Sequence, residues 1–161
     1  MLEINNTTKQ KINFKKTQEL SAAFLRAYKK PGASVSLALV GDAKIKSLNR
    51  DYRGIDKATD VLSFPAEKSG FKAKGYLGEI IINLQELARA RKYKALFKEL
   101  TANRPVAAVK KQPGLFKQKD YLFYFVLAHG LLHLIGYNDR TEAARQVMVE
   151  EGREFLEKFL V

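Results

Sequence analysis

Hydrophobic residues recur with two different periods along the chain, and these periods predict a mixture of strands and helices. Short alternating or continuous apolar runs predict four strands, at residues 2–5, 34–40, 59–64 and 76–82. Apolar residues three and four positions apart predict amphipathic helices, at residues 17–28, 42–52, 120–135 and 141–159. Asn83 followed by Glu86 has the spacing of a capping box, which predicts one more helix start.

The apolar stripe of each amphipathic helix predicts which side chains face the core. Asp42 precedes the second stripe and would cap that helix. The helix at 120–135 is apolar on nearly every side, which predicts that protein covers it all round. The inward residues predicted for the first, second and last helices are Leu20, Ala23, Phe24 and Ala27; Ile45, Leu48 and Tyr52; and Ala144, Val147, Met148, Phe155 and Phe159.

The order of these elements predicts an α+β fold. Strands and helices are mixed in the first part of the chain, and two helices close it. No internal repeat and no linker rich in Pro, Gly or Ser divides the 161 residues, a length that suits one domain. We therefore expect a single domain over residues 1–161, in which helices pack on a small mixed sheet.

The composition is that of a globular protein, with 46% hydrophobic and 29% charged residues. The chain has no cysteine, which excludes disulfides and thiolate metal sites. Its first residues lack the apolar segment of a secretory signal. The longest apolar stretch, 121–135, is shorter than the roughly 20 residues that a membrane-spanning helix needs. We expect a cytoplasmic protein with no membrane segment.

A net charge of +12 is the first indication of function. Ten basic residues and one acidic residue lie between Arg89 and Lys119, interleaved with aromatic side chains. Clustered cations beside aromatic rings suit a polyphosphate chain with exposed bases, and the alternative is a solubilising face of a basic protein. The candidate nucleic-acid-binding residues of this segment are Arg91, Lys92, Lys94, Lys98, Lys110 and Lys111.

The two histidines of the chain, His129 and His133, lie four residues apart within the predicted apolar helix. Four residues turn a helix by about 400°, so both imidazoles leave one face, with Cβ atoms about 5–6 Å apart. Two ring nitrogens can then share one ion at about 2.0–2.1 Å. Gly136 can end the helix in a left-handed cap, and Asp139 can return a carboxylate to the same ion.

These residues also have a structural interpretation. A histidine inside an apolar helix is commonly a hydrogen-bonded core residue, and Asn138 and Asp139 are common turn residues. The combined spacing favours a metal site, although not that of a metalloprotease, whose general base is a Glu after the first histidine. Gly130 holds that position here. The remaining chemistry for such an ion is activation of water or stabilisation of charge at phosphorus.

Three motifs of the chain have the form of a known family's motifs. Residues 129–137 are HGLLHLIGY, and upstream lie residues 48–54 (LNRDYRG) with 59–65 (TDVLSFP), and residues 77–80 (LGEI). The first resembles the signature H-G-x-L-H-L-x-G-Y-D-H of the YbeY family of rRNA maturation factors, and the last resembles that family's L-G-D-I strand. The motifs occur in the family's order and are spread over most of the chain.

The resemblance implies a cytoplasmic metalloprotein with a zincin-like α+β fold and a buried helix that carries metal ligands. It implies a metal-dependent endoribonuclease that cuts single-stranded RNA in rRNA maturation and ribosome quality control. Ribosomal RNA and the small ribosomal subunit would be its partners, and the chain would be a monomer or a weak oligomer. By position, His129 and His133 resemble the first two zinc ligands, with His129 catalytic, and Arg53 resembles the arginine that contacts phosphate.

Two positions depart from the family signature, and the first is Asn138, where the family has aspartate. The third histidine of the family falls at position 139, where this chain has Asp139. Two histidines and a carboxylate can still hold one ion, and we predict His129, His133 and Asp139 as ligands of Zn²⁺. An oxygen ligand shifts the preference somewhat towards manganese or iron. A weakened or lost site is the other outcome of the change.

Two functions therefore compete. In the first, the chain is an endoribonuclease whose ion acts on the scissile phosphate or on water, while Arg53 neutralises developing charge and the basic segment holds the strand. In the second, it is a non-catalytic, RNA-binding ribosome-assembly factor with a degenerate metal site. A zinc peptidase is disfavoured because Gly130 replaces the general base.

Overall fold

The computed structural model describes residues 1–70, 73–89, 95, 98 and 118–160. Its helices and strands alternate through most of the chain, as the hydrophobic pattern predicts. In chain order they are β1 (Leu2–Asn6), α1 (Phe14–Ala27), β2 (Ser34–Val40), α2 (Asp42–Arg53), β3 (Val61–Pro65), α3 (Ala66–Ser69), β4 (Tyr76–Asn83), α4 (Leu84–Leu87), α7 (Gln118–Leu134) and α8 (Glu142–Leu160).

The four strands form one mixed sheet in the order β1-β2-β4-β3. Strands β1, β2 and β4 are parallel, and β3 lies antiparallel to β4 at the edge. The parallel pairs are joined by helical crossovers, which parallel strands require. This architecture confirms the predicted α+β class and the small mixed sheet packed by helices.

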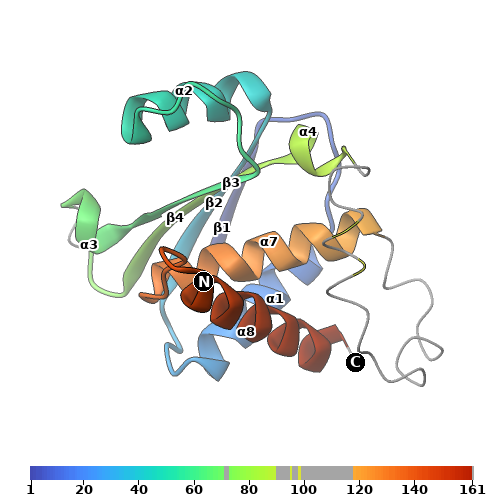
Figure 1. Ribbon diagram of the computed structural model, residues 1–161. Coiled ribbons are helices and arrows are strands. Elements are labelled where there is room, and N and C mark those ends of the chain that lie inside the picture. Colours follow the sequence, from blue (N-terminus) through green and yellow to red (C-terminus); the bar gives the residue numbers. More distant parts are fainter. Residues whose placement is uncertain (71–72, 90–94, 96–97, 99–117, 161) are drawn as a thin grey trace.

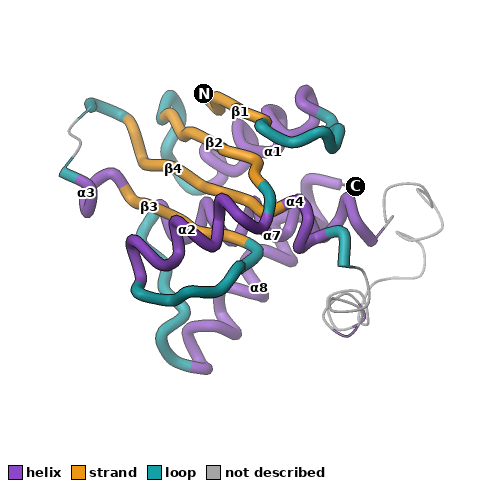
Figure 2. The backbone as a smooth tube through the Cα atoms, turned by 90° about the horizontal axis from the view of Figure 1, so that it is seen from above, coloured by secondary structure: helices purple, strands orange, loops and turns teal. Residues whose placement is uncertain are grey.

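Helices cover both faces of the sheet, because its strands carry apolar side chains on both sides. Figure 1 shows α1, α7 and α8 on one face and α2 on the other, and Figure 2 shows the same sheet from above. Successive side chains of a strand point to opposite faces. In β4, Ile80 and Ile82 accordingly pack into the larger core, whereas Ile81 packs with Ile45 of α2.

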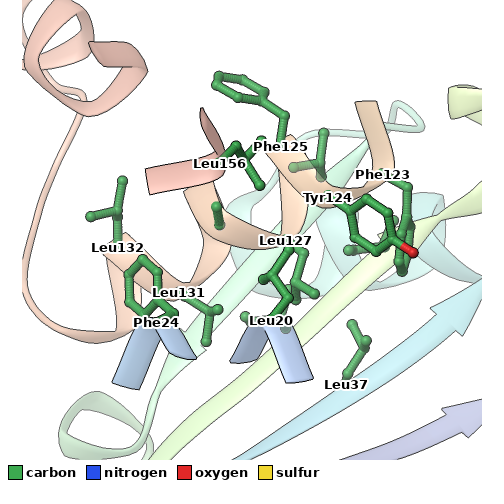
Figure 3. Close-up of a cluster of buried hydrophobic side chains, with 14 of the residues drawn as sticks. Leu20, Phe24, Leu37, Phe123, Tyr124, Phe125, Leu127, Leu131, Leu132 and Leu156 are labelled. Carbon is green, nitrogen blue, oxygen red and sulfur yellow. The ribbon is translucent and has the colours of Figure 1, made fainter. Parts of the chain in front are cut away.

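Helix α7 lies at the centre of the larger core. Leu127 and Leu131 are fully buried, and α8 contributes the equally buried Leu156. Figure 3 shows these side chains beside Leu20 and Phe24 of α1. The sheet, α1 and α8 together surround α7, which explains why its sequence is apolar on nearly every side. No helix in the described part of the chain combines the length and the hydropathy needed to cross a lipid bilayer.

The start of α1 and the cap of α2 differ from the sequence prediction. Helix α1 begins three residues early, at Phe14, because the Asn13 side chain accepts a hydrogen bond from the Lys16 N–H at 3.0 Å. Asp42 is the first residue of α2 rather than its cap. Its backbone N–H donates to Oε1 of Gln85 at 2.7 Å, so a side chain of another element satisfies this helix start.

Three residues that the apolar stripes predict to face the core are exposed. Ala27 is exposed, Tyr52 is 69% exposed and Val147 is 53% exposed. Ala27 and Tyr52 lie at the ends of their helices, whereas Val147 lies about 100° round α8 from the fully buried Met148, at the edge of the stripe. In α8 the inward positions continue instead through Leu156 and Leu160, which are both buried.

The predicted helix cap at Asn83 is confirmed, but only one of the two hydrogen-bonding halves of the predicted capping box forms. Asn83 Oδ1 accepts hydrogen bonds from the N–H groups of Gln85 and Glu86 at 3.1 and 3.3 Å. The backbone N–H of Asn83 donates to the carbonyl of Asp60 rather than to Glu86. The buried Glu86 carboxylate instead pairs with Arg89, which also bridges to Asp42.

Candidate metal centre

Helix α7 and the turn that follows it bring three potential ligands together. His129 and His133 lie one helical turn apart, and their rings are 4.7 Å apart between centroids. Their Nε2 atoms are 3.2 Å apart. Oδ2 of Asp139 lies 3.8 Å from Nε2 of His129 and 3.7 Å from Nε2 of His133. The three residues could hold one metal ion.

The turn that returns Asp139 is a Schellman motif around Gly136. The Gly136 N–H donates to the carbonyl of His133, and the Tyr137 N–H donates to the carbonyl of Leu132, both at 3.1 Å. Gly136 has φ of +106°, a conformation that L side chains rarely adopt. The predicted helix end at Gly136 is therefore present, and it reverses the chain next to the histidines.

The spacing of the donor atoms fits a tetrahedral ion. Two nitrogens that bind one such ion at about 2.0–2.1 Å lie about 3.3–3.4 Å apart, close to the 3.2 Å between the two Nε2 atoms. The carboxylate is slightly farther away, and its side chain is 47% exposed. The histidine side chains are only 18% and 24% exposed, so the cluster opens to solvent on the side of Asp139.

The ring nitrogens that face away from the cluster have different surroundings. Nδ1 of His133 lies 3.1 Å from the backbone carbonyl of Tyr137, which can only accept a hydrogen bond. Nδ1 of His133 therefore carries the proton, and its Nε2 is left free to bind an ion. Nδ1 of His129 is buried and has no hydrogen-bond partner among the described residues.

Burial lowers the pKa of His129 below its ordinary value of about 6.5, and the neighbouring His133 lowers it further. Asp139 and Asp60 act in the opposite direction, because their negative charges favour the protonated ring. The net effect keeps His129 uncharged near neutral pH. An uncharged imidazole is the form that binds a metal.

The lowered pKa predicts that acid destabilises the metal-free chain. Below pH 6.5 the unfolded chain takes up a proton at His129 that the folded chain resists, so the free energy of unfolding falls as the pH falls. Chemical denaturation in chelator at a series of pH values measures this slope. His129→Gln should flatten the part of the curve just below pH 6.5, and an unchanged slope in that variant would contradict the assignment.

Gly130 lies where α7 packs most closely on the sheet. A Cβ at this position would lie 2.9 Å from Cγ2 of Ile80, which is fully buried in β4. The position that holds a general base in metalloproteases therefore points into the core here and has no room for a side chain. This contact gives a packing reason for Gly130 and agrees with the sequence-based argument that disfavours a peptidase.

The structure does not bring Arg53 into the cluster. Arg53 is exposed at the end of α2, which lies on the opposite face of the sheet from α7 (Figure 1). Within the described residues no hydrogen bond or ion pair links Arg53 to the three donors. Its predicted role at phosphate stays a prediction.

Of the predicted nucleic-acid-binding segment, Lys98 is described and is exposed. The other five candidates, Arg91, Lys92, Lys94, Lys110 and Lys111, lie outside the described residues.

Three contributors to the cluster were not predicted as functional. The Tyr137 carbonyl fixes the proton of His133, and the Phe125 ring stacks on His129 at 6.4 Å between centroids. Asp60 accepts a hydrogen bond from the Val61 N–H at 2.8 Å and also acts electrostatically on His129. Asp60 thus combines a structural contact with a charge close to the cluster.

The fold and the cluster together define an α+β protein with a potential His-His-Asp metal site. The sequence model of the family "Endoribonuclease YbeY" matches residues 3–103 and 106–160. The chain therefore belongs to the endoribonuclease YbeY family, which confirms the resemblance stated from its motifs.

Individual relatives agree with this assignment. The endoribonuclease YbeY of Desulforamulus reducens is 40% identical over 137 residues, which cover 80% of this chain and 73% of the relative. That of a Geobacillus species is 30% identical over 166 residues, covering 98% of this chain and 92% of the relative. The solution structure of TM1509 from Thermotoga maritima has the same fold, with a TM-score of 0.57 at 24% identity, over 99% of this chain and 89% of the other.

Proposed function

We propose that this chain is a metal-dependent endoribonuclease that cuts single-stranded RNA in rRNA maturation and ribosome quality control. The observation that carries the proposal is the convergence of His129, His133 and Asp139, whose donor atoms lie within 4.8 Å of one another. Membership of the endoribonuclease YbeY family supplies the reaction class.

In this proposal His129, His133 and Asp139 hold one divalent ion, which we assign as Zn²⁺. When bound, such an ion supplies Lewis-acid stabilisation of charge at phosphorus or lowers the pKa of a water nucleophile. The Tyr137 carbonyl keeps the proton of His133 on Nδ1, away from the cluster. The low exposure of both histidines limits access of water from the core side.

Arg53 would neutralise charge on the RNA backbone, because a guanidinium binds phosphate with several donors at once. It is exposed and makes no ion pair in the described part of the chain, so it is available to a ligand. Arg91, Lys92, Lys94, Lys98, Lys110 and Lys111 would contribute further contacts to the strand. We further propose the small ribosomal subunit as partner, a monomer or weak oligomer as the state in solution, and the cytoplasm as the location.

Asp139→Ala tests whether the carboxylate is a ligand. We expect zinc affinity to fall by at least about tenfold and RNA cleavage to fall with it, because even an outer-shell contact to a metal ligand is typically worth 10–100-fold. Elemental analysis of untagged protein and cleavage of a single-stranded RNA measure the two quantities.

Asn138→Ala is the matched control, because it removes no donor and disturbs the same exposed turn only through the Asn138 Oδ1 atom, which accepts a hydrogen bond from the Arg140 N–H at 3.3 Å. It should keep both metal and activity. Asp139→His, which restores the residue of the family signature, should bind zinc more tightly than the natural chain. Full metal content and full activity in Asp139→Ala would remove the carboxylate from the site.

A further inference from the structure

A pocket of about 320 Å³ lies near the N-terminal end of α7, away from the three donors. Phe123 and Tyr124 line it, and Figure 3 shows them at the opposite end of the buried cluster from Leu132. The helical rise from Phe123 to His129 and His133 is about 9–15 Å. None of the three donors lines the pocket, so it is a separate site.

One side of this pocket is apolar. Leu84 and Leu87 of α4 line it together with Phe123, and all three side chains are otherwise buried in the core. The volume lies at the lower end of the range of small-ligand pockets, about 300–1,000 Å³. Because these three side chains are at most 6% exposed, they form the back of an apolar wall whose accessible surface comes from the partly exposed Ile12. Such apolar surface can cover one face of a nucleobase.

The rim of the pocket is cationic. Lys11 and Lys16 line it, and Nζ of Lys16 lies 5.8 Å from the centroid of the Tyr124 ring. This cation–π contact keeps the ammonium group beside the apolar wall. Between Glu3 and Glu19 the chain has four lysines and no acidic residue. A phosphate at the rim would therefore meet positive charge.

Polar acceptors complete the lining. Asp120 offers a carboxylate, which can accept a hydrogen bond from a ribose hydroxyl or from a base N–H. Gln10 also lines the pocket, and its Oε1 atom is buried without a hydrogen-bond partner among the described residues. Turning this oxygen towards a ligand would therefore break no hydrogen bond to the described protein.

We propose that this pocket binds one nucleotide of the single-stranded RNA, at a position of the strand away from the scissile phosphate. The base lies against the accessible part of the apolar wall, at Ile12, and its phosphate lies near Lys11 and Lys16. The identity of the ligand as part of an RNA substrate rests on the proposed function. Because the pocket is separated from the histidines, it contributes to the affinity for the RNA and to the position of the strand, and it takes no part in the cleavage step.

The test compares two pairs of substitutions with the same change in charge. Lys11→Gln with Lys16→Gln removes the pocket cations, whereas Lys9→Gln with Lys15→Gln removes neighbouring lysines that do not line the pocket. Binding of a fluorescent oligouridylate to the full chain is measured in chelator at several salt concentrations. We expect the pocket pair to lose about tenfold more affinity for the RNA than the control pair. The slope of its log affinity against log salt concentration should also be shallower, by about the contribution of one phosphate contact.

A second measurement locates the ligand directly. Titration of the ¹⁵N-labelled chain with uridine monophosphate should shift the amide signals of Asn13 and Tyr124, and not those of His129 and His133. Equal losses in the two lysine pairs, or shifts confined to the histidines, would overturn the proposal. Neither measurement needs cleavage, so a chain that binds RNA through the pocket without cutting it would refute the proposed activity and leave the pocket standing.

Discussion

His129→Ala is expected to abolish RNA cleavage, with a loss of at least about 10³-fold. The ion contributes several kcal/mol of charge stabilisation at phosphorus, and each 1.4 kcal/mol is about tenfold in rate. His129 is one of three candidate ligands and supplies one of the two nitrogen donors. Its removal therefore leaves His133 and Asp139 as a two-ligand site. A two-ligand site holds zinc weakly, and the metal content of the purified variant should fall in parallel with activity.

The experiment needs a check that the variant is folded, because the His129 side chain is mostly buried. Chemical denaturation in chelator provides it, and Asn138→Ala serves as the control for substitution near the cluster. Excess zinc should restore part of the activity if the loss arises from weakened binding. Unchanged cleavage by a folded, metal-free His129→Ala chain would remove the metal from the mechanism. Binding of RNA without cleavage by the zinc-loaded natural chain would instead favour the non-catalytic assembly factor.

The strands and the long helices could be predicted because their signals are local. The run of apolar residues in β2 and the stripe through Leu20 and Phe24 in α1 are complete within one element. Errors occurred where another element decides the outcome. Gln85 of α4 satisfies the start of α2, and the packing of α8 on the core buries Met148 but leaves the neighbouring Val147 exposed.

The candidate ligands could be predicted for the same reason. His129, His133 and Asp139 lie within eleven residues, and the Schellman turn at Gly136 that joins them has its own sequence signal. The surroundings of the cluster could not be predicted in this way. A backbone carbonyl such as that of Tyr137 has no residue type, and the closeness of Asp60 to His129 depends on how β3 packs against α7.

The contacts between the turn after α7 and distant parts of the chain could not be predicted from local sequence patterns either. The hydroxyl of Tyr28 donates to Glu151 at 2.6 Å, and the Tyr28 ring meets the ring of Tyr137 edge to face at 6.3 Å. Burial and the Glu151 carboxylate raise the pKa of Tyr28. These contacts join α1 and α8 to the turn that holds His133. The turn beside the candidate ligand His133 is thus packed against Tyr28, which lies more than a hundred positions earlier in the chain.

Gly78→Ala is expected to destabilise the chain by about 3 kcal/mol or more. Gly78 lies in β4 at a shift in the register with β2, and its φ of +135° is a conformation that favours glycine. A Cβ there would lie 2.2 Å from the Phe64 carbonyl oxygen, which is backbone and cannot rotate away. Backbone strain of about 1–3 kcal/mol and overpacking of about 1–3 kcal/mol then add.

Gly75→Ala separates these two causes. Gly75 also has a positive φ, of +78°, but a Cβ at that position would have no atom within 4 Å. This variant should lose only about 1–2 kcal/mol, the cost of the left-handed backbone, as measured by urea denaturation of both variants. The added methyl at Gly78 would also press on Cδ2 of Leu134, at the end of α7 next to His133. Gly78→Ala should therefore lower metal affinity as well as stability, and an equal loss of stability in the two variants would show that backbone strain alone explains the need for glycine.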